Sequence, residues 1–384
     1  MYITRLSAKN WKNFTEIDVS LRDIVYLVGP NASGKSNFLD IFRFLRDIVN
    51  PKGGGIQKAV SDRGGLKRIR CLAARKYPDV EIRVELKEDL DDTEPTWEYY
   101  LSFQGDQSNK QRVRIVHEEV FHHGRKILAR PETDDENDSE RMTSTFLEQV
   151  NANKDFRDVS GCFDDVLYLH LVPQLLKFGN QLAVQRMESD PFGQGFLDMV
   201  ASTVTRTRDS RLKRINTILK SVIPQFKELQ FERDKITGTP HLKMLYQHWR
   251  DNGAWQSEDQ FSDGTLRLIS LLWTLMSSKK LILLEEPELS LHGPIVEQIP
   301  TLFYDALASR KKTIGQIIVS THSERLLSDK SLDAGSFLLI RPGKIGETSR
   351  IEPLDEDDIE AISAGKSPAE IVFAKTESSI KRLA

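Results

Sequence analysis

The feature that most constrains this chain is residues 29–36, which match the pattern G-x-x-x-x-G-K-[ST] at every fixed position. The apolar run 24–28 precedes them, and apolar side chains at helical spacing follow from 37 to 49. A glycine-rich turn between a buried strand and a helix directs backbone N–H groups at phosphate oxygens. The sequence therefore predicts a phosphate-binding loop made of Gly29, Pro30, Asn31, Ala32, Ser33, Gly34, Lys35, Ser36 and Asn37. We expect Lys35 on the β- and γ-phosphates and Ser36 as a ligand of Mg²⁺.

A second apolar run, 281–284, leads directly into the acidic residues Glu285, Glu286 and Glu288. Open α/β sheets place ligand chemistry at the carboxyl ends of their strands. Next to a phosphate-binding loop, the first acid can assist the metal and the second can act as general base toward water. We assign these roles to Glu285 and Glu286. Glu285 stands where most phosphate-loop proteins carry Asp, and Glu288 has either a role in the site or a structural one.

Strands and helices alternate at both ends of the chain. The expected strands there are 2–6, 17–21, 24–28, 281–284 and 317–320, and the expected helices are 37–49, 265–277 and 293–309. Glycines at 53–55 and 64–65 predict a flexible connection over about 50–66. This alternation, with a different pattern in the middle, indicates a discontinuous α/β domain that carries an insertion.

The middle of the chain contains several patterns. Period-two alternation within 78–130 predicts an antiparallel subdomain of three or four strands. The acidic stretch 133–140 is expected as an exposed loop, 141–222 as helical, and 226–249 as two short strands around a turn at 237–240. The predicted domains are 1–120 with the phosphate loop and the antiparallel subdomain, 121–250 as an insertion and helical arm that binds partners, and 251–384 as the rest of the α/β domain.

Charge and composition exclude some classes of protein. The chain has 54 Lys and Arg against 57 Asp and Glu, so binding of nucleic acid by the whole surface is not expected. It has no run of 18 apolar residues, which argues against a membrane span, and its start lacks the pattern of a secretory signal. Its two cysteines fit a reducing compartment, so we expect a cytoplasmic protein.

Three further segments resemble motifs of ABC-type ATPases. Residues 261–265 (Phe-Ser-Asp-Gly-Thr) resemble the signature motif in the form seen in OLD-like (overcoming lysogenization defect) and RecF-like members. Residues 319–323 (Val-Ser-Thr-His-Ser) resemble the switch-histidine segment, and 6–14 look like the first strand and turn of SMC, RecF and OLD-type heads. The resemblance covers about 1–50 and 255–325. It implies an α/β P-loop NTPase fold of the ABC-type head, here with an antiparallel β subdomain and a helical insertion.

The resemblance also implies an activity and an assembly. ATP would be hydrolysed to ADP and phosphate with Mg²⁺, in a homodimer that holds two ATP molecules between its subunits; higher assembly is left open. Ser262, Asp263 and Gly264 of one subunit would complete the site of the other, and His322 would sense the γ-phosphate. The Q-loop glutamine of such ATPases is not assigned: Gln57 is a candidate, and Gln104 lies within the predicted antiparallel subdomain. No aromatic residue is assignable to adenine stacking.

Partners follow from the same resemblance. Stand-alone OLD-like AAA ATPases without a TOPRIM domain are often encoded beside an effector, commonly a nuclease, in antiviral defence. The acids at 355–360 are expected as a solvated turn, because about 60 residues after His322 are too few for a fused nuclease domain. The alternative is a RecF- or SMC-like repair clamp on duplex DNA; a non-hydrolysing structural ATPase is another rival. Two basic clusters would suit DNA: Arg63, Lys67, Arg68, Arg70, Arg75 and Lys76, and Arg206, Arg208, Arg211, Lys213 and Arg214.

Overall fold

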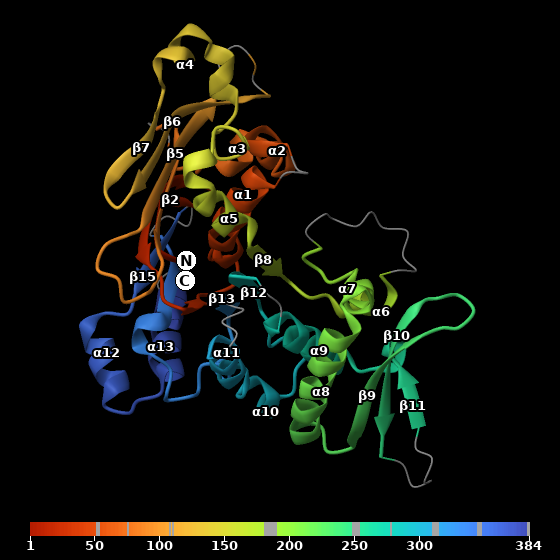
Figure 1. Cartoon of the computed structure of the whole chain (residues 1–384). Helices are drawn as coiled ribbons and strands as arrows, with labels where there is room; N and C mark the ends of the chain where they lie inside the picture. Colours follow the sequence, from red (N-terminus) through yellow and green to blue (C-terminus); the bar gives the residue numbers. More distant parts are fainter. Residues whose placement is uncertain are drawn as a thin grey trace.

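The computed structural model describes residues 1–50, 54–74, 77–106, 109, 111–179, 190–247, 254–276, 279–308, 315–343 and 348–381. A large mixed sheet runs through these residues, and a smaller sheet lies at its side (Figure 1). The strands of the large sheet are β1 (Tyr2–Trp11), β2 (Phe14–Ser20), β3 (Ile24–Val28), β4 (Val80–Lys87), β5 (Trp97–Gly105), β6 (Val113–His122), β7 (Arg125–Arg130), β8 (Val166–Leu169), β12 (Leu281–Glu285), β13 (Gln316–Thr321), β14 (Phe337–Pro342) and β15 (Ser349–Pro353). Their spatial order is β7-β6-β5-β4-β1-β2-β15-β14-β3-β13-β12-β8.

Helices cover both faces of the parallel part of this sheet. The α-helices are α1 (Lys35–Val49), α2 (Gly55–Asp62), α3 (Leu66–Ile69), α4 (Thr133–Asn137), α5 (Arg157–Asp164), α6 (Pro173–Phe178), α7 (Phe196–Ser202), α8 (Thr205–Val222), α9 (Asp263–Leu275), α10 (Gly293–Val296), α11 (Ile299–Leu307), α12 (Glu356–Ser363) and α13 (Pro368–Lys381). Short 3₁₀ turns are η1 (Ser139–Thr143), η2 (Lys154–Phe156), η3 (Glu258–Gln260) and η4 (Ala334–Ser336). None of these described helices combines the length and the apolar content that a membrane crossing needs.

The parallel half of the sheet positions the predicted site. Strands β14, β3, β13, β12 and β8 lie side by side and run in the same direction. Val25 and Leu27 of β3 are buried in the core that includes α1, whereas Tyr26 and Val28 are buried in the core that includes α9. The apolar run is therefore a strand covered on both faces, as expected. Because the carboxyl ends of parallel strands meet at one edge, the residues that follow β3, β12 and β13 come together.

An antiparallel wing extends the same sheet. Strands β4 to β7 pair in sequence as hairpins, and β4 joins them to β1. Val80, Ile82, Val84 and Leu86 of β4 are fully buried, and the charged residues between them face the other side. This alternation confirms the antiparallel subdomain predicted for 78–130.

The expectations for several connecting segments were wrong. The stretch 50–66, predicted as flexible, contains α2, whose Ile56, Ala59 and Val60 are buried. The single helix predicted for 293–309 is instead two helices, α10 and α11, in the described residues up to 308, and α11 has Pro300 in its first turn. The acids at 355–360 form a capping box and the first turns of α12, where Asp358 is buried against Lys375. Acidic side chains at a helix start are favoured by the helix dipole, which the composition of the stretch alone does not reveal.

The middle of the chain also departs from a purely helical arm. Residues 141–222 include β8, which pairs with β12 in the large sheet. Only four residues long, this strand carries no periodic signal of its own. A separate sheet consists of β9 (Phe226–Arg233), β10 (Pro240–Tyr246) and β11 (Ala254–Ser257), which confirms the two strands predicted within 226–249 and adds one. The boundaries at 120 and 250 stay predictions.

The acidic stretch 133–140 contains a buried ion network. The Arg130 guanidinium is 3.0 Å from the Glu118 carboxylate and 3.0 Å from that of Asp135 in α4, and all three side chains are inaccessible to solvent. Burial raises the pKa of Glu118, although the Arg130 charge and hydrogen bonds to it oppose that shift. The expectation of a plain exposed loop was wrong at this point, because Asp135 pairs with Arg130, five residues earlier in the chain, and is buried with it and with Glu118.

Replacing Arg130 with alanine should lower the free energy of unfolding by about 3–5 kcal/mol, because the buried Glu118 loses its counter-charge and Asp135 keeps only Arg141, 3.1 Å away. Urea unfolding monitored by tryptophan fluorescence measures the change. Arg83, which is 45% exposed beside Glu98, offers a matched control. Arg83→Ala should change stability by about 0–1 kcal/mol. Equal effects of the two substitutions would contradict the role of the network.

Candidate functional site

The predicted phosphate loop lies between the carboxyl end of β3 and the start of α1. Gly34 has a φ of 112°, and a Cβ there would lie 2.3 Å from the Asn13 side-chain nitrogen. A Cβ at Gly29 would lie 2.6 Å from the Ile340 carbonyl oxygen. Both fixed glycines of the motif are therefore required by backbone conformation or close contact.

Lys35 is buried at the first position of α1. Its Nζ donates to the carbonyl oxygens of Gly29 at 2.8 Å and Pro30 at 3.2 Å, so the ammonium lies inside the loop. Burial lowers the pKa of Lys35, and the carboxylates of three nearby glutamates oppose this shift. The cation is thus held where it can meet an anion that enters the loop.

Ser36 and Glu285 meet at the edge of the sheet. The Ser36 hydroxyl donates to Oε1 of Glu285, the last residue of β12, and the Tyr168 hydroxyl donates to Oε2. A hydroxyl and a carboxylate oxygen beside a phosphate loop are the hard ligands that Mg²⁺ takes together with substrate phosphates. The residues present therefore fit a magnesium ion. The two positions are 249 residues apart in the sequence.

Glu286 is held in an unusual backbone conformation. Its φ is 45°, in the left-handed region, and its N–H donates to the Ser320 carbonyl oxygen at 3.0 Å. Its Oε1 is 3.0 Å from Nδ1 of His322, which follows β13. Non-glycine residues in this conformation carry strain of about 1–3 kcal/mol and cluster at functional sites. The structure therefore brings the predicted base and the predicted switch histidine into contact.

Glu288 is buried beneath the same sheet edge, in contact with Thr321 and His322. Its Oε1 accepts a hydrogen bond from the Thr321 hydroxyl at 2.6 Å and lies 3.4 Å from the His322 backbone nitrogen. Burial raises the pKa of Glu288, and the hydrogen bond from Thr321 opposes that shift. Of the two roles left open by the sequence, these contacts favour a structural one, in which Glu288 fixes the backbone that carries His322.

The signature-like segment begins α9. The Ser262 hydroxyl accepts from the Thr265 N–H at 3.1 Å, which makes Ser262 the N-cap, and Asp263 lies 2.7 Å from Lys177. A Cβ at Gly264 would lie 2.3 Å from the Ser290 carbonyl oxygen. Ser262 is exposed, and within the described part of the chain no hydrogen bond joins it to the phosphate loop. One chain thus unites Lys35, Glu285 and His322 but leaves Ser262 facing outward.

Residues that the sequence did not single out complete the loop. The Asn13 side-chain nitrogen donates to the Ser33 carbonyl oxygen at 2.9 Å and to Ser349 Oγ at 2.8 Å, and its Oδ1 accepts from Asn37 at 2.8 Å. Ser349 Oγ donates to the same Ser33 oxygen at 2.6 Å. Asn13 belongs to the segment 6–14 that resembles known heads, which was a usable signal. Ser349 lies in β15, where no motif marks it.

Gln57, the candidate for the Q-loop glutamine, makes hydrogen bonds to the backbone of two other elements. The Gln57 side-chain amide donates to the carbonyl oxygens of Val113 at 2.8 Å and Thr143 at 2.6 Å, and its oxygen accepts from the Val113 N–H at 3.1 Å. Gln57 therefore joins α2 to β6 and η1. Gln104 lies within β5.

The two basic clusters divide into structural and accessible cations. Arg63, with 9% of its side chain exposed, lies 3.0 Å from Asp40, whereas Arg208 lies over the ring of Phe231 and Arg211 over that of Trp273. Arg75 and Lys76 lie outside the described residues. A cavity of about 710 Å³ borders the phosphate loop at Asn37, and its cations favour anions. They are Lys12, Arg43, Arg63, Lys67, Arg68 and Arg70.

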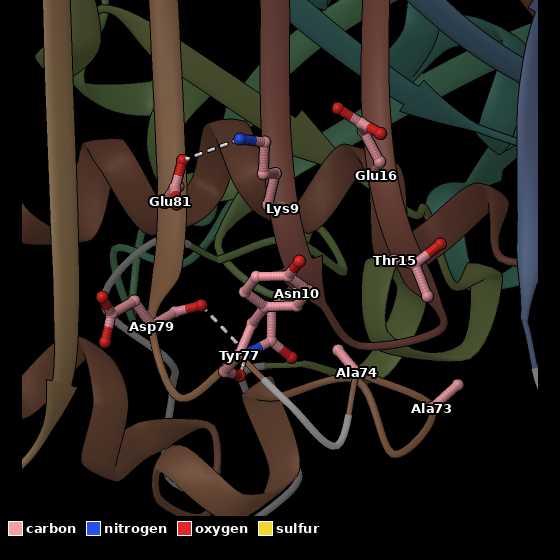
Figure 2. Close-up of a pocket in the computed structure, with 9 residues that line it drawn as sticks. All are labelled: Lys9, Asn10, Thr15, Glu16, Ala73, Ala74, Tyr77, Asp79 and Glu81. Carbon is pink, nitrogen blue, oxygen red and sulfur yellow. Dashed lines mark hydrogen bonds and ion pairs between the residues drawn. The ribbon is translucent and has the colours of Figure 1, made fainter.

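A second cavity of about 690 Å³ lies on the outer face of β1, β2 and β4 (Figure 2). Glu16, Asp79 and Glu81 line it, and its cation Lys9 is 3.3 Å from Glu81. Carboxylates in excess repel phosphate. The cavity beside Asn37, rather than this one, suits an anionic ligand.

Replacing Asn13 with alanine should weaken ATP binding about tenfold. The Ser33 carbonyl oxygen and the Asn37 side chain each lose a hydrogen bond, and the loss of one such bond costs about 1 kcal/mol. Titration with a fluorescent ATP analogue measures the affinity. Asn216, which makes comparable side-chain bonds to the Leu212 and Leu229 backbone, is the matched control. Asn216→Ala should leave the affinity unchanged. Unaltered affinity in Asn13→Ala would show that Asn13 does not shape the loop.

Comparison with known proteins agrees with this geometry. Residues 24–328 match the family described as "AAA domain, putative AbiEii toxin, Type IV TA system". The DNA replication and repair protein RecF of Synechocystis sp. is 30% identical over 88 residues, and that of Roseiflexus castenholzii is 34% identical over 61 residues. These matches cover 23% and 16% of this chain, and the same shares of the relatives.

A solved structure shows the fold across nearly the whole chain. The SMC head bound to the C-winged helix domain of ScpA aligns over 93% of this chain and 99% of that chain, with a TM-score of 0.53 and 14% identity. The phosphate loop, the acidic strand end and the histidine segment lie within the family match. The chain therefore belongs to the family described as "AAA domain, putative AbiEii toxin, Type IV TA system", and it has the fold of an SMC head.

Proposed function

We propose that this chain hydrolyses ATP with Mg²⁺ and uses the cycle as a dimeric switch. The observation that carries the proposal is the contact between Ser36 of the phosphate loop and Glu285 of the acidic strand, beside the pair of Glu286 and His322. A phosphate loop alone binds nucleotide. A carboxylate at hydrogen-bonding distance from a histidine, at the same sheet edge, adds a group that can accept a proton from water.

Each residue has a defined part in this proposal. The loop N–H groups and Lys35 hold the phosphates, and Ser36 and Glu285 hold the metal, which offsets charge on the phosphate oxygens. Glu286 orients the attacking water and accepts its proton. His322, already 3.0 Å from Glu286, holds that carboxylate in place and senses the γ-phosphate.

A second subunit would complete the site. Ser262 is exposed at the N-terminus of α9, a helix of 13 residues whose first N–H groups favour an anion. No described contact joins this segment to the loop of its own chain. Contact of Ser262, Asp263 and Gly264 with ATP on a partner copy accounts for both facts.

Glu286→Gln should lower ATP turnover at least about a hundredfold and keep ATP binding, because the amide cannot accept a proton. With ATP, this variant should accumulate as a dimer in size-exclusion chromatography. Adding Ser262→Arg should abolish the dimer and keep nucleotide binding. Ser221→Arg, at another exposed serine, is the control that should not.

Two outcomes would overturn parts of this proposal. Unaltered turnover in Glu286→Gln would favour a non-hydrolysing structural ATPase. Turnover per subunit that is the same at every dilution, with no ATP-dependent dimer, would exclude a shared site.

We further propose that the switch controls a separate effector, such as a nuclease, in antiviral defence. The description of the matched family as putative toxins of a type IV toxin–antitoxin system supports such a setting, as does the OLD-like form of residues 261–265. We place the partner-binding surface in 121–250 and the protein in the cytoplasm. Protection of cells from phage by the chain together with its neighbouring gene, lost in Lys35→Ala, tests the idea.

The second candidate is an ATP-controlled clamp on duplex DNA. The curated relatives are named DNA replication and repair proteins, and exposed cations border the cavity at Asn37. Two accessible residues of that cavity, Lys67 and Arg68, are suited to contact a phosphate backbone.

If the clamp is correct, ATP should stimulate a shift of duplex DNA that weakens as salt rises. Lys67→Glu with Arg68→Glu should abolish the shift, and Arg125→Glu with Lys126→Glu, an exposed pair on β7 outside both basic clusters, should not. Absence of a shift at low salt would remove this candidate.

A further inference from the structure

The side chain that secures Glu285 comes from a strand outside every sequence motif. Tyr168 lies in β8 opposite Leu283 of β12, and Glu285 is two residues farther along β12. Side chains two residues apart on a strand share a face, so Tyr168 and Glu285 project to the same side of the sheet. That side also carries α1, which begins with Lys35 and Ser36.

Each oxygen of the Glu285 carboxylate accepts a hydrogen bond from a different hydroxyl group. Ser36 donates to Oε1 and Tyr168 donates to Oε2. The oxygen bound by Tyr168 is therefore directed away from Ser36, and the other oxygen is kept beside it. A glutamate has one methylene group more than an aspartate and a further rotatable bond. Without a second partner, its carboxylate would have several orientations at this edge.

Tyr168 is itself fixed. The side chain is buried, with 6% of its surface exposed, and the Arg43 guanidinium lies 4.2 Å from its ring centroid. Arg43 is also 3.6 Å from Asp40 within α1. The ring is thus packed between the strand that carries it and the helix that follows the phosphate loop, which limits the motion of its hydroxyl.

We propose that Tyr168 is a positioning residue. Its hydroxyl holds the Glu285 carboxylate beside the Ser36 hydroxyl and thereby sets the affinity of the site for Mg²⁺. The proposal rests on the metal role of Ser36 and Glu285 in the proposed function. It explains how a glutamate serves where most phosphate-loop proteins have an aspartate: the neighbouring strand supplies the constraint that the shorter side chain does not need.

The test is the Mg²⁺ dependence of nucleotide binding, measured with a fluorescent ATP analogue in the Glu286→Gln background, so that hydrolysis does not intervene. Tyr168→Phe removes the hydroxyl and keeps the ring against Arg43. The Mg²⁺ concentration for half-maximal binding should rise about tenfold, the effect of losing a hydrogen bond to a charged group, and binding without Mg²⁺ should not change. Tyr99→Phe is the matched control, because the Tyr99 hydroxyl is 3.2 Å from the buried Glu118 of the antiparallel wing.

A double-mutant cycle separates positioning from a general structural effect. In a chain with Glu285→Asp, the shortened carboxylate no longer reaches Tyr168, so adding Tyr168→Phe should change the Mg²⁺ dependence less than about twofold. Wild-type Mg²⁺ dependence in Tyr168→Phe, or an equal effect of Tyr168→Phe with Asp at 285, would overturn the proposal. If Ser36→Ala and Glu285→Ala also keep the wild-type Mg²⁺ dependence, the metal role in the proposed function fails instead.

Discussion

The site depends on the parallel register of three buried strands. In that register Glu285 of β12 lies opposite Ser320 of β13, and Thr321 lies opposite Val28 of β3. Side chains alternate between the two faces of a strand. A shift of β12 by one residue relative to its neighbours would therefore place Glu285 on the face of the sheet that does not carry α1. The apolar residues of these strands are buried on both faces, and this burial fixes the register. Hydrophobic packing is therefore what holds the acidic groups next to the loop.

Charge is concentrated at this edge. Lys35 is a buried cation influenced by three carboxylates, and burial and these charges act on its pKa in opposite directions. Arg267 of α9 adds a further constraint, because its guanidinium donates to the carbonyl oxygens of Leu171 and Glu286. It thus joins the segment after β8 to the strained residue that we propose as the base. Helix α9, whose N-cap is Ser262, therefore contacts Glu286 and also carries the surface that we propose for a second copy.

The segment between residues 121 and 250 contributes more to the head than an arm would. Strand β8 extends the sheet beyond β12, and Tyr168 extends the site to that strand. The separate sheet of β9, β10 and β11, together with α8, projects away from the large sheet (Figure 1). Helix α8 contacts α9, and Arg267 of α9 donates to the carbonyl oxygens of Leu171 and Glu286, so the projecting part is joined to the site through α9.

The sequence alone determined the phosphate loop, the acidic strand end and the histidine segment, because each is a short pattern in which local residues set the backbone. It also predicted the antiparallel wing, since strict alternation is a local signal. Only the tertiary structure decided that Asn13, Ser349 and Tyr168 support the site. Their contacts join residues as far apart as 336 positions, and hydrogen bonds over such separations leave no periodic trace in a single chain. The acidic composition of 133–140 likewise did not reveal that Asp135 is buried beside Arg130, because this network also includes Glu118, which the fold brings in from β6.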